Sequence, residues 1–182
     1  MRKILAIGAS TSSSSINRKL AAHAASLLEG VEVEVLDLND FSMPLYSEDL
    51  EKSGGVHPQA KGFIEKVAAA DGVIISMAEH NGSYSAAFKN TYDWASRCEQ
   101  KVWAGKPMLL MATSPGGRGG MTAPAAAEEK FPRMGGELVA TFSLPSFHEN
   151  FSEDDGITEN ALAADLKAAV EKFGKAIRMI AS

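Results

Sequence analysis

The sequence has little of several features that mark particular classes of protein. It contains one cysteine, Cys98, so no disulfide can form within the chain, which is typical of a reducing compartment. The formal net charge at pH 7 is −5, without a basic cluster of the kind that binds nucleic acid or a membrane surface. No apolar run is long enough to cross a membrane, and the run KILAIGA (3–9) ends in no convincing signal-peptide cleavage site. We therefore expect a cytoplasmic protein whose partners include neither nucleic acid nor a membrane.

The few histidines and the cysteine also lack the spacing of a metal site. His23 is expected on a helix, and His57 and His148 in loops, without a second ligand at a useful spacing. Cys98 has no second cysteine with which to form a redox pair, so a passive thiol is expected. No metal ion is predicted.

What the chain does contain is a regular alternation of strand-like and helix-like segments. A length of 182 residues with 45% apolar side chains suffices for one domain, expected to span residues 1–182. The expected strands are 3–9, 31–38, 71–78, 106–113 and 137–144. The expected helices are 16–30, 59–70, 85–98, about 122–134 and a last one that carries Leu162 to Ile177, while the turn-rich segment 39–58 is expected to be irregular. This alternation predicts an α/β fold, a parallel sheet with helices on both faces.

Three loops with unusual side chains follow the expected strands. They cover residues 9–16 (the first loop), 78–84 (the second loop) and 114–120 (the third loop). Open parallel sheets bind ligands at the carboxyl ends of their strands, so these loops are expected to form one site.

The first loop is rich in hydroxyl groups and has no cation. Its six consecutive hydroxyl side chains precede a helix that begins near Ile16. A helix N-terminus attracts an anion through its free N–H groups, and hydroxyls add neutral hydrogen-bond donors. The motif of nucleoside triphosphate sites fails because no lysine follows, and the dinucleotide motif fails because Ser10 and Ser13 replace glycines. The pattern therefore favours a terminal monophosphate, although a flexible serine loop with Ser15 as a helix cap explains it almost as well.

Taken together, the three loops resemble those of the NADPH-dependent FMN reductase family, flavodoxin-like proteins that include quinone and azo-dye reductases. The family's first motif, G-S-x-R-x-x-S-x-N, corresponds to Ala9, Ser10, Ser12, Ser15 and Asn17. Its second, P-E-Y-N-x-S with L-K-N-x-x-D-W on the next helix, corresponds to Glu79, Asn81, Ser83, Lys89, Asn90, Asp93 and Trp94. Its third, S-x-G-G-x-G-G, corresponds to Ser114, Gly116, Gly117, Gly119 and Gly120. The resemblance extends over essentially the whole chain, but Ser12 stands in place of the family's arginine, Ala78 of its proline and His80 of its tyrosine.

The resemblance implies a flavodoxin-like three-layer sandwich with strand order 2-1-3-4-5, and FMN as the cofactor. It implies that FMN contacts Ser10, Ser12, Ser15, Ile16, Asn17, Glu79, His80, Asn81, Gly82, Ser83, Ser114, Pro115, Gly116, Gly117 and Gly119. Because the cofactor would carry out the redox chemistry, no catalytic side chain is expected, and Glu79 is expected to have a structural role. NADPH or NADH would be the electron donor, with Arg118 as a hypothetical contact for the 2′-phosphate of NADPH. The acceptor would be a small oxidised molecule: a quinone, an azo compound, free flavin or a metal oxyanion.

The sequence allows more than one role for several features. By resemblance the chain is expected to be a homodimer or homotetramer, and Phe88, Tyr92 and Trp94 to lie in the core or at a subunit contact. The acidic segment 147–157 is expected to be a solvated connector or part of the acceptor's entrance. Two other functions remain possible: a flavodoxin-like electron carrier that serves protein partners, and a regulator that has lost its flavin.

Overall fold

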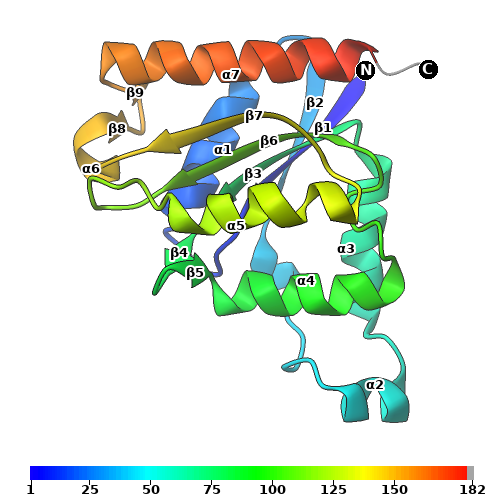
Figure 1. The fold of residues 1–182 in the computed structure, drawn as a ribbon. Helices are drawn as coiled ribbons and strands as arrows, with labels where there is room; N and C mark the ends of the chain where they lie inside the picture. Colours follow the sequence, from blue (N-terminus) through cyan, green and yellow to red (C-terminus); the bar gives the residue numbers. More distant parts are fainter. Residues whose placement is uncertain (180–182) are drawn as a thin grey trace.

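A five-stranded parallel sheet forms the centre of the protein, whose computed structural model describes residues 1–179 (Figure 1). The strands are β1 (Arg2–Gly8), β2 (Val31–Leu36), β3 (Gly72–Met77), β6 (Pro107–Thr113) and β7 (Glu137–Leu144). Their order is β2-β1-β3-β6-β7, and all four neighbouring pairs run parallel. This is the flavodoxin-like order 2-1-3-4-5, so the predicted fold is confirmed.

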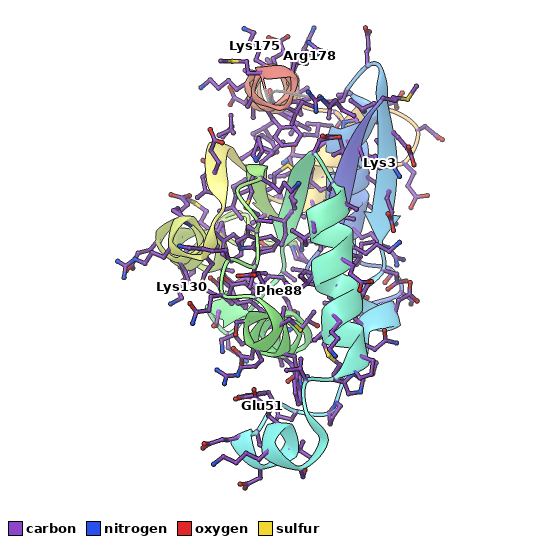
Figure 2. The ribbon with its side chains drawn as sticks, turned by 90° about the vertical axis from the view of Figure 1, so that its right-hand side faces the viewer. Lys3, Glu51, Phe88, Lys130, Lys175 and Arg178 are labelled. Atoms are coloured by element: carbon purple, nitrogen blue, oxygen red, sulfur yellow. The ribbon has the colours of Figure 1, made fainter. Side chains whose placement is uncertain are left out.

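Helices cover both faces of the sheet and bury two hydrophobic clusters against it. One face carries α1 (Ile16–Ser26) and α7 (Asn160–Met179). The other carries α3 (Pro58–Ala69), α4 (Ala86–Cys98) and α5 (Thr122–Lys130). Phe63, Phe88 and Phe131 are fully buried in this second cluster, and Figure 2 shows Phe88 on α4 inside the molecule. Full burial of a side chain of this size contributes about 1.5–3 kcal/mol to the stability of the fold. The two clusters therefore hold the helices against the sheet.

The aromatic residues of α4 lie in the core, one of the two places expected for them. Trp94 is 2% exposed, and its indole N–H donates to the carbonyl of Pro44 (2.8 Å). Tyr92 stacks between Phe88 and Trp103, with ring centroids 5.7 and 5.8 Å away. Cys98 is partly buried, and burial raises the pKa of its thiol, which fits a passive side chain.

The segment 39–58 was expected to be irregular, and this prediction is wrong in part. It contains a 3-10 helix, η1 (Leu38–Phe41), and a short α-helix, α2 (Glu48–Gly54). The Ser47 side chain caps α2 by accepting from the N–H of Leu50, and the first turn of α2 is acidic, which suits the helix dipole. None of the α2 side chains is buried, so α2 produces no apolar stripe by which a sequence could be recognised as helical.

Several other boundaries differ from expectation for local reasons. The helix expected to reach residue 134 ends at Lys130, and Pro132 begins a separate 3-10 helix, η2 (Pro132–Met134). The first helix ends at Ser26 rather than Gly30. The connector 147–157 is folded as α6 (Phe147–Asn150) and a hairpin of β8 (Phe151–Ser152) and β9 (Gly156–Ile157). A second hairpin joins β4 (Glu79–His80) to β5 (Ser83–Tyr84). The predicted domain end, residue 182, lies outside the described residues.

No helix within residues 1–179 combines the length and apolar character needed to span a membrane.

Candidate functional site

One cleft lies at the carboxyl ends of β1, β3 and β6, where the three loops meet. Its volume is about 470 Å³, within the range of about 300–1,000 Å³ that is typical of small-molecule sites. Figure 1 shows α6 and both short hairpins at this end of the sheet. Predicted site residues that line the cleft are Ser10, Ser12, Ser15, Ile16, Asn17, Glu79, His80, Ser114 and Pro115. Predicted residues outside its lining are Asn81, Gly82, Ser83, Gly116, Gly117, Arg118 and Gly119.

The first turn of α1 presents free hydrogen-bond donors to this cleft. Ser15 is the N-cap, and its hydroxyl oxygen accepts from the N–H of Arg18 (3.1 Å). Within the described chain, the N–H groups of Ile16 and Asn17 have no hydrogen-bond partner, as is usual for the first residues of a helix. Ser15 therefore caps the helix, as one alternative proposed, and the same turn still leaves two backbone donors for an anion.

The side chain of Asn17 has a structural role, which was not predicted from the sequence. Its amide nitrogen donates to the carbonyl of Thr113 (3.1 Å), while its amide oxygen accepts from the N–H of Thr113 (3.0 Å) and the hydroxyl of Ser76 (2.7 Å). All three partners are buried at the ends of β3 and β6. Asn17 thus fixes the start of α1 to both strands, and only its backbone N–H remains available to a ligand.

Glu79 also has a structural role, in agreement with the expectation for it. One carboxylate oxygen accepts from the N–H groups of Thr122 (2.7 Å) and Ala123 (3.1 Å) at the start of α5. A carboxylate suits a helix N-terminus because it meets the positive end of the dipole. Glu79 therefore ties the second loop to the helix that follows the third loop.

The second loop is a tight hairpin whose turn consists of Asn81 and Gly82. Both residues have positive φ, 52° and 72°, as a type I′ turn requires. The pair Asn-Gly between two short extended runs is a strong sequence signal for such a turn, and it could have been recognised from the sequence. Ser85 follows the hairpin directly. Its buried hydroxyl donates to the carbonyl of Ala9 (2.7 Å) and so joins the first and second loops.

The third loop packs against the segment that follows β7. The hydroxyl of Ser143 donates to the carbonyl of Gly119 (2.9 Å), and the N–H of Ser146 donates to the carbonyl of Gly116 (3.0 Å). Gly119 has φ 62°, and a Cβ there would lie 2.4 Å from the hydroxyl of Ser143, so no other residue fits this position. Gly117 faces open space, so a flat ligand can approach its backbone closely. Arg118 is exposed, and its side chain has no partner among the described residues.

The segment after β7 forms the far wall of the cleft, which favours the second of the two roles expected for residues 147–157. Phe147 and Phe151 stack with their centroids 4.7 Å apart, and both line the cleft. Behind them, His23 of α1 meets the edge of Phe151 (5.5 Å), and a Cβ on Gly156 would overlap the His23 ring. Burial lowers the pKa of His23, which favours the neutral imidazole in this packed position.

Two cations adjoin the first loop, and neither was predicted, because the phosphate-site pattern comprises only the side chains of the loop itself. The guanidinium of Arg18 donates to the carbonyl of Ser13 (2.8 Å) and pairs with Asp37 (2.7 Å), so it supports the loop from behind. Lys19 lines the cleft and pairs with Glu153 of the β8–β9 turn. Helical spacing could have located Lys19, since it lies four residues after Ser15 and side chains at that spacing share one face. The remaining cleft residues were not named individually as site residues, although all but Thr113 lie in the first loop, the second loop or the segment 147–157: Ser14, Ala78, Thr113, Phe147, His148, Phe151 and Glu153.

A larger hollow of about 710 Å³ lies elsewhere, along the exposed edge of β7 beside α5 and α7. It lies at the side of the sheet, away from the carboxyl ends where doubly wound sheets bind ligands. The smaller cleft is the better candidate, because the loops from three strands and the free N–H groups of α1 converge there.

Known proteins provide an independent comparison for this arrangement. A family model described as NADPH-dependent FMN reductase matches residues 2–149. An NADPH:quinone oxidoreductase of Arabidopsis thaliana is 38% identical over 91 residues, 50% of this chain and 45% of that protein. A quinone reductase of Pseudomonas putida is 28% identical over 172 residues, 91% of this chain and 89% of that protein. Thus the chain spans less than half of the Arabidopsis protein but most of the Pseudomonas one.

A solved structure is similar over nearly the whole chain. The flavoenzyme NAD(P)H:(acceptor) oxidoreductase FerB of Paracoccus denitrificans superposes with a TM-score of 0.78 at 28% identity. The match covers 98% of each chain.

Proposed function

Because the chain belongs to the NADPH-dependent FMN reductase family, we propose that it is an FMN-dependent oxidoreductase that passes electrons from NAD(P)H to a small oxidised acceptor. Residues 1–179 would form a single FMN-binding domain. NAD(P)H and the acceptor would occupy the same open cleft in turn, which gives ping-pong kinetics. Quinones are the favoured acceptor class, because the relatives in Arabidopsis and Pseudomonas putida carry that activity in their names.

The observation that carries this proposal is the set of unused donors at the start of α1. The N–H groups of Ile16 and Asn17 have no partner in the described chain, and Ser10, Ser12 and Ser15 line the same cleft. Such donors fit a phosphate monoester, whereas an apolar ligand would leave them without hydrogen bonds. Gly117 and Gly82 have open space where a Cβ would be, which fits the close approach of a flat ring system. The residues present therefore fit FMN.

The residues of the cleft would hold FMN, which would supply the redox chemistry between NAD(P)H and the acceptor. The chain's own residues would bind and orient the cofactor and the substrates. Phe147 and Phe151 form an apolar wall that accommodates flat acceptors, and Glu79 keeps the second loop in place through α5. The backbone N–H groups of Asn81 and Gly82 are proposed to contact the edge of the ring system. These two residues lie outside the cleft lining, so that contact requires the ring to extend beyond the cleft.

The test is a titration of the purified chain with FMN, followed by the anaerobic addition of NADPH. If the protein is a reductase, it binds FMN, and the visible absorbance of the oxidised flavin falls rapidly when NADPH is added. An electron carrier binds FMN without bleaching by NADPH or NADH, and a regulator without flavin binds no FMN. Either of the last two results overturns the proposal.

Arg118 is proposed to recognise the 2′-phosphate of NADPH. It is exposed on the third loop without a partner among residues 1–179, so its guanidinium is available to a substrate phosphate. Replacing Arg118 by alanine should lower kcat/KM for NADPH by about tenfold, with little change for NADH, because a charged hydrogen bond contributes about 1.5–3 kcal/mol. An unchanged ratio of the two kcat/KM values removes this role.

The chain is also proposed to form a homodimer or homotetramer. The segment Ser42–His57 extends away from the sheet, as the position of Glu51 in Figure 2 shows, and leaves Leu45 80% exposed. An apolar side chain this exposed on a projecting segment fits a surface covered by a second copy. The molar mass from light scattering tests this, and a monomer at micromolar concentration would contradict it.

A further inference from the structure

The cleft contains an ion pair that joins two segments far apart in the sequence. Lys19 lies in the second turn of α1, and Glu153 lies in the turn between β8 and β9. Both side chains line the cleft, and their relative exposures are 40% and 76%. Lys19 also holds the pKa of the Glu153 carboxyl below its usual range, because the two are hydrogen-bonded.

Lys19 is the one lysine or arginine among the residues that line the cleft. Arg18 is engaged by Asp37 and by the carbonyl of Ser13, and Arg118 lies outside the lining. Because the side chains of a helix incline toward its N-terminus, Lys19 extends over the turn that begins at Ser15. Its ammonium group can therefore serve the same anion as the free N–H groups of Ile16 and Asn17.

We propose that Lys19 is the cation that binds the phosphate of FMN, and that Glu153 competes with the phosphate for it. This inference rests on the proposed function. It replaces the idea that neutral donors hold the phosphate alone, and it explains how the site tolerates Ser12 where the family has an arginine. When the nucleotide enters, Lys19 leaves Glu153 and turns to the phosphate.

The charges favour this exchange. A phosphate monoester carries about −1.5 to −2 charges at pH 7, whereas a carboxylate carries −1. An ion pair this exposed stabilises the chain very little, so breaking it costs little. The phosphate can also accept hydrogen bonds from the N–H groups at the start of α1. Glu153 accepts no hydrogen bond from these groups in the present structure.

The exchange does not require the far wall to unfold. The β8–β9 hairpin stays attached through Phe151, which stacks on Phe147 and meets His23, and through Gly156, which packs against the same histidine ring. Glu153 is therefore a removable contact on a hairpin that other contacts hold in place.

Three variants separate this proposal from a general effect on the fold: Lys19→Gln, Glu153→Gln and the double variant. Dissociation constants for FMN and for riboflavin, which lacks the phosphate, are measured by quenching of flavin fluorescence. Lys19→Gln should weaken FMN binding about tenfold and riboflavin binding less than about twofold, because only FMN offers a charged group to the ammonium. Glu153→Gln should strengthen FMN binding a few fold, and the double variant should match Lys19→Gln, since Glu153 acts only through Lys19.

Lys66→Gln is the matched control, because Lys66 also pairs with a carboxylate, Glu34, at similar exposure but outside the cleft. This variant should have the wild-type dissociation constants for both FMN and riboflavin. The proposal is overturned if Lys19→Gln binds FMN with wild-type affinity, or if it loses riboflavin and FMN to the same extent. Failure of the proposed function looks different: the wild-type chain then either binds neither flavin, or binds FMN that NADPH and NADH do not bleach, whatever the affinities of the variants.

Discussion

Replacing Ile16 by proline is expected to weaken FMN binding by about 10- to 100-fold, although α1 should remain intact. Proline has no N–H, so the variant removes one of the two free donors at the start of the helix. A hydrogen bond to a charged group contributes about 1.5–3 kcal/mol, which corresponds to that loss of affinity. Ile16 is the first helical residue, where proline is well tolerated, and Ser15 before it has ψ 113°, a conformation compatible with a following proline. Isothermal titration calorimetry with FMN measures the change in the dissociation constant.

Ile16→Ala is the matched control, because it removes the side chain and keeps the N–H. Its affinity for FMN should stay well above that of Ile16→Pro, while the two variants should bind riboflavin alike. Equal affinities of the two variants for FMN would mean that the phosphate does not lie on the first turn of α1.

Replacing Asn17 by leucine is expected to lower the free energy of unfolding by about 3 kcal/mol or more. The variant removes three hydrogen bonds and leaves the hydroxyl of Ser76 and both backbone groups of Thr113 without this partner. A buried polar group that loses its partner costs about 1–3 kcal/mol, and these groups are buried at two strand ends. For a chain of this length the midpoint of thermal unfolding should fall by roughly 6–12 °C.

Urea denaturation compares this variant with Ser12→Ala, an exposed residue whose hydroxyl makes only a 3.4 Å contact with Ser14. The Ser12 variant should stay within about 0.5 kcal/mol of the wild type. If Asn17→Leu does so too, Asn17 does not hold β3 and β6 to α1.

The central sheet could be predicted because each buried strand is a continuous apolar run between turn signals. Residues 72–77 and 107–113 are buried at every position, so periodicity and length suffice to recognise them. The strand order came from the family resemblance rather than from periodicity. The helix α2 was missed because its residues bury no side chain, and its signals were confined to its start, where a capping serine precedes an acidic first turn.

The site was only partly predictable, for reasons that particular residues illustrate. Asn17 lines the candidate cleft, and its predicted contact with FMN stays a prediction, but its side-chain role depends on Thr113, which is 96 positions away. The pairing of Lys19 with Glu153 spans 134 positions and arises only when the β8–β9 hairpin folds against α1. Contacts over such distances are created by the fold, and no local pattern in a single sequence encodes them.

The crystal structure of the chain in complex with FMN tests the central claim most directly. We predict that phosphate oxygens lie within hydrogen-bond distance of the N–H groups of Ile16 and Asn17, with the ammonium of Lys19 turned from Glu153 toward them. A phosphate found away from the start of α1, with Ile16 and Asn17 still unpartnered and Lys19 still on Glu153, would contradict the account.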